Sequence, residues 1–163
     1  RELSSQAAIE LLRIAIQAAR LSELKVVWEA TPADTRAMAE VTREYATGLA
    51  RLNADAEARS FIEQQLAKRW DDALVRLYGP LHCEDPVVQL ATLERWLQEH
   101  GEKVALLETA GQVCIKNRLW GKAKSYLEIG VRDCSQSSMN CAALPAPFAV
   151  IGPLLPMKAQ ARP

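Results

Sequence analysis

The fold is decided by one stretch of the sequence, VALLETAGQVCIKNRLWGKAKSYLEIGV at residues 104–131. It divides into two short amphipathic helices joined by a polar turn at Asn117 and Arg118. Small residues on the apolar faces, Gly111 and Ala123, let two antiparallel helices approach closely where these residues face each other. Other residues at helical spacing complete the two faces: Leu107, Ala110 and Cys114, then Trp120, Tyr126, Leu127 and Gly130. The stretch therefore predicts a helical hairpin.

The same pattern recurs earlier in the chain. Residues 33–52 and 55–68 predict a second hairpin, with Ala58 at the position of Ala123. The two alanines are 65 residues apart (123 − 58), which is close to two periods of about 34 residues. A small residue in one helix, followed about a dozen residues later by an aromatic-x-x-Ala pattern, resembles the tetratricopeptide repeat. That resemblance implies hairpins that stack on their neighbours.

A degenerate unit lies between these hairpins. One helix is expected to open at residues 70–72 and to end near Gly79. A second is expected over residues 85–100 and to end at Gly101. Together the elements predict an all-α, right-handed α-solenoid of about three tetratricopeptide-like hairpins.

An N-terminal helical piece precedes the hairpins. It is predicted over residues 4–21 and 24–30, with Ser4 or Ser5 as the first cap. Its inward residues are Ala8, Leu11, Leu12, Ala15 and Ala19. Packing between hairpins is expected for the four tryptophans, Trp28, Trp70, Trp96 and Trp120.

Residues 134–163 differ in composition from the repeat domain predicted over residues 1–133. They hold five of the eight prolines, and only Lys158 and Arg162 are charged. Proline forbids a continuous helix there, yet Phe148 and Ile151 favour burial. We expect an extended, Pro-rich tail that packs on the solenoid or on a neighbouring chain, which would allow a homodimer.

Charge and composition bear on the class of protein. The 20 basic and 20 acidic residues give a net charge of zero, which argues against nucleic acid as a partner. No apolar run of about 18 residues is present, so no membrane insertion by this chain is expected. The chain starts at Arg1 without Met, and we expect a fragment whose anchor would lie upstream. No set of nucleophile, base and orienting residue is evident, and no enzyme is predicted.

Four runs of residues resemble one particular family. They are Trp28 with Thr31-Pro32, WDDALVRLYG at 70–79, Glu94-x-Trp96-Leu97, and NRLWGKAKSYLE at 117–128. Over about residues 28–128 they look like the C-terminal repeat region of HemY, the proteobacterial inner-membrane tetratricopeptide protein encoded beside genes of late haem synthesis. The resemblance implies an upstream membrane anchor and a soluble, cytoplasmic repeat domain. It also implies a non-catalytic scaffold that brings haem-biosynthesis proteins together.

Repeats of this kind bind partners on the face lined by the first helix of each hairpin. The residues on that face, away from the apolar stripe, are expected to be Arg43, Thr47, Arg51, Asp72, Arg76, His82, Glu108, Gln112 and Lys116. Arginines spaced along a groove suit partner carboxylates. An ordinary solvated face is the alternative.

His82 and Cys83 form the one pair that could ligate a metal or haem iron. They have no companion ligand at a defined spacing, and neither do Cys134 and Cys141. His100 lies at an expected helix C-terminus, where an imidazolium favours the dipole without any ligand role. No metal and no cofactor are therefore predicted. The alternative function is a haem- or porphyrin-binding carrier or chaperone that uses His82, Cys83 and apolar groove residues.

Overall fold

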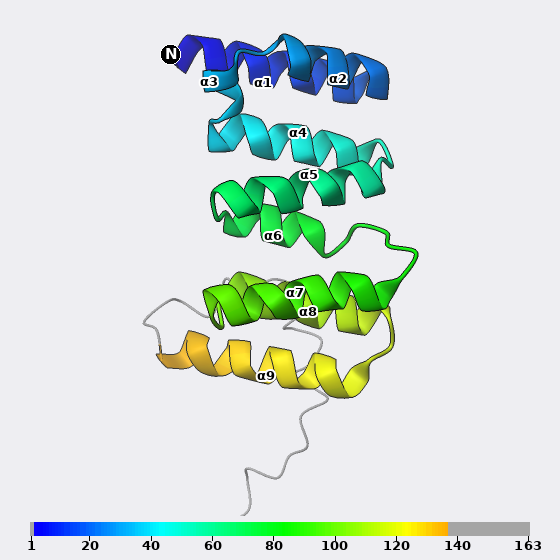
Figure 1. Ribbon diagram of the computed structural model, residues 1–163, viewed down its shortest axis with the longest axis vertical. Coiled ribbons are helices and arrows are strands. Elements are labelled where there is room, and N and C mark those ends of the chain that lie inside the picture. Colours follow the sequence, from blue (N-terminus) through cyan, green and yellow to red (C-terminus); the bar gives the residue numbers. More distant parts are fainter. Residues whose placement is uncertain (1, 137–163) are drawn as a thin grey trace, which may run out of the picture. The chain divides into compact units, whose positions relative to one another are not determined.

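The computed structural model describes the backbone of residues 2–136 and the side chains of residues 4–132. Every regular element in that range is a helix (Figure 1), which confirms the all-α prediction. The helices are α1 (Glu2–Gln17), α2 (Leu21–Ala30), α3 (Ala33–Arg36), α4 (Ala39–Arg51), α5 (Asp55–Lys68), α6 (Asp72–Tyr78), α7 (Pro86–His100), α8 (Val104–Lys116) and α9 (Trp120–Gln136). Helix α9 thus extends into the predicted tail. The rest of that tail, with Cys141, lies outside the described residues, as does the side chain of Cys134.

The chain divides into two compact units, residues 1–86 and residues 87–163. In the first unit α4 is central, because it contacts α1, α2, α3, α5 and α6. In the second unit α8 packs along α9. Polar contacts tie α7 to α9, since Glu94 Oε1 accepts from Lys122 Nζ at 3.1 Å and from Tyr126 OH at 3.0 Å.

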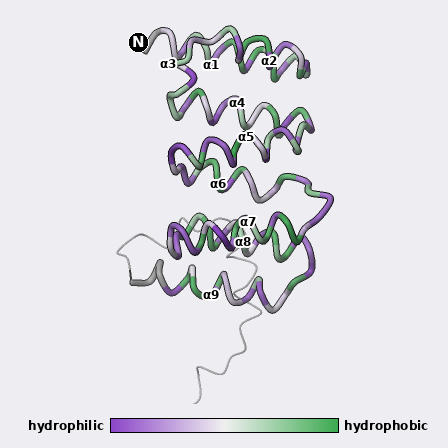
Figure 2. The backbone as a smooth tube through the Cα atoms, in the orientation of Figure 1, coloured by the Kyte–Doolittle hydropathy of each residue, from purple (hydrophilic) through white to green (hydrophobic). Residues whose placement is uncertain are grey.

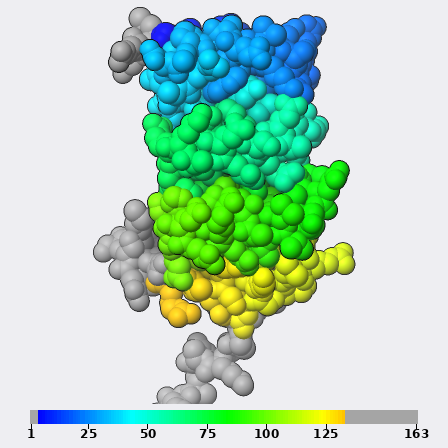
Figure 3. Space-filling view, in the orientation of Figure 1, coloured from blue at the N-terminus to red at the C-terminus, as the bar shows by residue number. Residues whose placement is uncertain are grey.

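Each long helix turns an apolar face inward, and hydrophobic and hydrophilic residues alternate along the helices in Figure 2. Figure 3 shows the atoms of the first unit closely packed over one face. The largest fully buried apolar side chains there are Leu12, Leu24, Leu49, Ile62, Leu74 and Tyr78. In the second unit they are Leu93, Leu106, Leu107 and Leu127.

In the described part of the chain, three hairpins close with the same turn. The turns lie between α1 and α2 at Ala19, between α4 and α5 at Asn53, and between α8 and α9 at Arg118, with φ of 55°, 58° and 60°. The amide of each of these residues donates to the carbonyl three residues before it, at 3.0, 3.2 and 3.0 Å. The next amide donates to the carbonyl five residues before it, at 3.3, 2.9 and 2.8 Å. This is the Schellman pattern, and it recurs after 34 (53 − 19) and 65 (118 − 53) residues.

The single helix predicted over residues 33–52 is wrong. Helix α3 ends at Arg36 and α4 begins at Ala39, with an extended backbone at Met38 between them (φ −74°, ψ 132°). Thr42 Oγ1 donates to the carbonyl oxygens of Arg36 at 2.9 Å and of Met38 at 3.0 Å. A threonine hydroxyl competes with the backbone in this way, and it satisfies a carbonyl group that the break removes from the helix ladder. The apolar spacing on either side of the break gives no sign of it.

The N-terminal cap and part of the first apolar face were also predicted wrongly. Helix α1 begins at Glu2, so Ser4 and Ser5 lie inside it. Leu11 is 53% exposed, whereas Leu12 is fully buried. Neighbouring residues on a helix point about 100° apart, and the buried face of α1 includes Leu12 but not Leu11. Ala19, expected to face inward, is the exposed residue of the turn.

The tryptophans differ in burial, and the expectation for one of them is wrong. Trp28 stacks on Tyr45 with ring centroids 4.2 Å apart, and Trp96 is 5% exposed. Trp120, in contrast, is 63% exposed. It is the first residue of α9, and side chains of a helix lean toward its N-terminus, so the indole extends past the end of the packed face.

Helices α8 and α9 approach closely at Gly111, as expected, but the residue opposite differs. A Cβ atom at Gly111 would lie 2.7 Å from Cγ and Cδ2 of Leu127. The small residue thus accommodates a large aliphatic side chain rather than Ala123. The contact remains one in which any side chain at residue 111 would have to displace its neighbour.

Candidate functional site

Helix α4 carries the first three predicted groove residues. Arg43, Thr47 and Arg51 are four residues apart, so they share one face of the helix. Arg43 and Arg51 are exposed and Thr47 is partly exposed, while Thr47 Oγ1 donates to the Arg43 carbonyl oxygen at 2.8 Å. The buried residues of α4 lie on its other faces. The helix therefore presents a polar strip that contains two arginines.

Arg43 is held by a carboxylate of the chain itself. Its Nε lies 2.7 Å from Asp71 Oδ2 and its Nη2 lies 3.0 Å from Asp71 Oδ1, a bidentate arrangement. Asp71 is also the N-cap of α6, where Oδ1 accepts from the Ala73 amide at 2.9 Å. One carboxylate thus caps α6 and ties it to α4.

The surroundings of this pair keep it ionised. Burial by itself raises the pKa of Asp71, but hydrogen bonds from Arg43 and from the Ala73 and Leu74 amides outweigh burial and hold the pKa below its usual value. The same hydrogen bond raises the pKa of Arg43. Asp71 was missed as a site residue, although an aspartate directly before an apolar helical pattern is a recognisable N-cap.

The other predicted residues of the first unit lie on α6 and beyond it. Asp72 and Arg76 are exposed and one turn apart on α6, and Asp72 Oδ1 accepts from Trp70 Nε1 at 2.8 Å. His82 lies in the connection after α6, and its amide donates to Asp55 Oδ2 at 2.8 Å. The structure thus brings Arg43 to the first turn of α6, whereas the backbone of His82 is bound to the first residue of α5.

In the second unit Glu108, Gln112 and Lys116 share a face of α8 by spacing. Glu108 is only 3% exposed, so its side chain does not lie on an open surface. Lys116 is exposed, and its Nζ lies 3.4 Å from Gln89 Oε1. Of this trio, Gln112 and Lys116 remain accessible to a partner.

A polar cluster around Glu94 was not predicted. Burial and the hydrogen bond to Glu94 raise the pKa of Tyr126 to about 12. Burial raises the pKa of the nearby Cys114 thiol to about 11. Both groups are therefore protonated at neutral pH, and the cluster supplies packing and hydrogen bonds rather than a nucleophile.

The His82 and Cys83 pair has local partners. Cys83 Sγ donates to the Asp85 carbonyl oxygen at 3.0 Å. Within the described residues, no three His, Cys, Asp or Glu side chains converge as metal ligands. Haem carriage through this pair remains a prediction.

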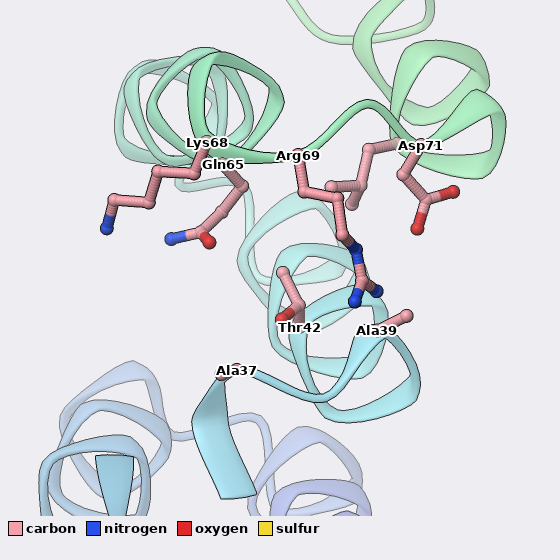
Figure 4. A pocket seen from close by; sticks show the side chains of 8 residues that line it. Ala37, Ala39, Thr42, Gln65, Lys68, Arg69 and Asp71 are labelled. Atoms are coloured by element: carbon pink, nitrogen blue, oxygen red, sulfur yellow. The ribbon is translucent and has the colours of Figure 1, made fainter. Parts of the chain in front are cut away.

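A cavity of about 280 Å³ opens beside the polar strip, between the start of α4 and the end of α5. Figure 4 shows the side chains that line it, among them Thr42, Gln65, Lys68, Arg69 and Asp71. Sequence reasoning missed the basic residues here, because it assigned the end of α5 to an outer helix without a binding role.

No protein-family model, no curated protein and no solved structure matches this chain. The HemY resemblance therefore remains a prediction. Among the helices of residues 2–136, none combines the length and the apolar character that crossing a bilayer requires.

Proposed function

We propose that the chain is a non-catalytic scaffold of the tetratricopeptide-repeat type, which binds a partner protein along the first helices of its hairpins. The observation that carries this proposal is the recurrence of one Schellman turn at Ala19, Asn53 and Arg118. The intervals of 34 and 65 residues are close to one and two tetratricopeptide periods. In repeat proteins, stacked hairpins form extended concave binding surfaces.

The polar strip of α4 is the proposed contact surface in the first unit. Arg43 is engaged by Asp71, so its main role is to fix α6 against α4. Arg51 is exposed, and within the described residues it has no ion-pair partner. Its planar guanidinium suits a bidentate bond to a partner carboxylate. Arg51 is therefore the residue of the strip on which partner binding should depend most.

The resemblance to HemY over residues 28–128 suggests which partners to look for. On that basis the scaffold organises haem-biosynthesis proteins at the bacterial inner membrane. An anchor upstream would hold the repeats on the cytoplasmic side. The resemblance is the only support for this part of the proposal.

The proposal is tested by affinity capture with the anchored, full-length protein. Proteins recovered by wild type and by Arg51→Glu are compared by quantitative mass spectrometry. Arg132→Glu is the matched control, because Arg132 is an exposed arginine on α9 and the substitution changes the charge by the same amount. Haem-pathway proteins should be captured by wild type and by Arg132→Glu, and at least tenfold less by Arg51→Glu.

The other outcomes separate the parts of the proposal. Equal capture by all three proteins would remove the α4 strip as the contact surface. Capture of a reproducible partner outside haem metabolism, sensitive to Arg51→Glu, would retain the scaffold and reject the HemY-based assignment. Circular dichroism on each variant establishes that helicity is unchanged.

A further inference from the structure

The cavity between α4 and α5 has one wall from each helix. Ala39 and Thr42 belong to the first turn of α4, and Gln65, Lys68 and Arg69 come from the last turn of α5 and the residue after it. In Figure 4 the Arg69 side chain extends across the opening toward Ala39 and Thr42. The Arg69 guanidinium thus lies at this opening, whereas the Lys68 side chain extends away from it, beyond Gln65 (Figure 4).

The two basic residues that line this cavity, Lys68 and Arg69, are exposed and form no ion pair within the described residues. Asp71 is the one acidic residue among those lining the cavity, and both of its oxygens are occupied by Arg43. Glu40 on the first turn of α4 is exposed and raises the pKa of Arg43.

The N-terminus of α4 adds positive electrostatic potential to the cavity. Its N-cap, Met38, provides no side-chain hydrogen bond to the first amides of the helix. Those amides and the helix dipole favour negative charge. Glu40, the acidic residue of this first turn, partly offsets that charge, and Arg69 extends over the same end of the helix (Figure 4).

We propose that this cavity binds an oxyanion, and that the carboxylate of an acidic side chain on a partner protein supplies it. A volume of about 280 Å³ admits one side chain and is smaller than most pockets that enclose a whole cofactor. Arg69 would bind the carboxylate in bidentate fashion, and Lys68, which also lines the cavity, would add positive charge at longer range. The inference rests on the proposed function only in taking the carboxylate from a partner.

The test uses the isolated chain and small probes, so no partner is needed. The ¹⁵N-labelled protein is titrated with N-acetyl-glutamate and, separately, with inorganic phosphate, at constant ionic strength set by sodium chloride. Saturable shifts of the Ala39 and Glu40 amide resonances with N-acetyl-glutamate are expected. Phosphate should bind more weakly.

Two matched double variants complete the test. Lys68→Gln with Arg69→Gln removes two charges from the cavity and should weaken N-acetyl-glutamate binding at least tenfold. Lys124→Gln with Arg132→Gln removes two charges from exposed positions on α9 and should leave binding within twofold.

Absence of saturable shifts, or equal shifts in both double variants, would overturn the site. Saturation by phosphate alone would overturn the assignment to an acidic side chain. Failure here is distinguishable from failure of the scaffold, because loss of partner capture in Arg51→Glu does not depend on this cavity.

Discussion

At the scale of single residues, the three hairpin turns rely on a backbone conformation that glycine adopts most easily, yet none of them contains glycine. Ala19, Asn53 and Arg118 all have positive φ. Asparagine tolerates this region better than alanine or arginine, because its short polar side chain bonds locally. The three turns thus have the same backbone geometry, while the residues that form them store different amounts of strain.

Ala19→Gly should stabilise the protein. The left-handed conformation costs an alanine about 1–2 kcal/mol, and glycine loses about 0.5–1 kcal/mol of chain entropy on folding, so a net gain of about 0.5–1 kcal/mol is expected. The measurement is the free energy of unfolding in urea. Ala18→Gly is the control: its φ is not positive, and it should destabilise by about 0.5–1 kcal/mol. A change of the same sign in the free energy of unfolding for both variants would contradict the strain argument.

Gly111→Ala should destabilise the α8 and α9 hairpin. Its new Cβ would lie 2.7 Å from two carbon atoms of Leu127, and overpacking of this kind costs about 1–3 kcal/mol. Gly121→Ala on α9 is the control, since a Cβ there meets nothing within 4 Å and the better helix propensity should add about 0.5–1 kcal/mol. The measurement is the thermal unfolding temperature of both variants, which should fall for Gly111→Ala and rise for Gly121→Ala. A neutral Gly111→Ala would show that Leu127 can move aside.

At the scale of the elements, Asp71 joins α4 to α6, and its charge should make stability depend on pH. Asp71→Asn keeps a good N-cap but removes the ion pair with the half-exposed Arg43, and should cost about 1 kcal/mol at pH 7. The native pKa lies below the unfolded value of about 3.9. The stabilisation is therefore complete above the unfolded pKa and is lost as pH falls through the lowered native pKa.

Urea unfolding of wild type and Asp71→Asn from pH 7 to pH 2 measures this difference. The two curves should converge in acid, and a difference that persists at pH 2 would rule out the ion pair as its source. The neighbouring Asp72→Asn provides the comparison. Asp72 is exposed and its carboxylate accepts only the Trp70 indole in the described contacts, so the substitution should change stability little at any of these pH values.

The elements also show what a sequence pattern can and cannot predict. The helix bounds near Gly101 and Asp71 were predictable, because positive φ and capping are local properties of the chain. The break at Met38 was not, since it depends on the Thr42 hydroxyl bonding two carbonyl groups while the apolar spacing continues. The Arg43 partner was also missed, because helical periodicity says which residues share a face but not what lies opposite.

At the scale of the whole molecule, periodicity predicted the hairpins but not the division of the chain. The compact turn that joins the other hairpins does not occur between α6 and α7, where residues 79–85 form a longer connection. The boundary between the two units falls at the end of that connection. Apolar spacing reports each helix separately, so it cannot show how far the packing continues from one hairpin to the next.

If the two units unfold independently, crowding side chains in one unit should not destabilise the other. Gly48→Ala would place a Cβ 2.9 Å from side-chain atoms of Ile16 and Leu24, and Gly111→Ala would crowd Leu127. Amide hydrogen exchange should then show faster exchange in α1, α2 and α4 for the first variant, and in α8 and α9 for the second. Each variant serves as the control for the other. Faster exchange throughout the chain in both would mean that residues 2–136 unfold as one cooperative unit, with coupling passing from hairpin to hairpin as nearest-neighbour repeats require.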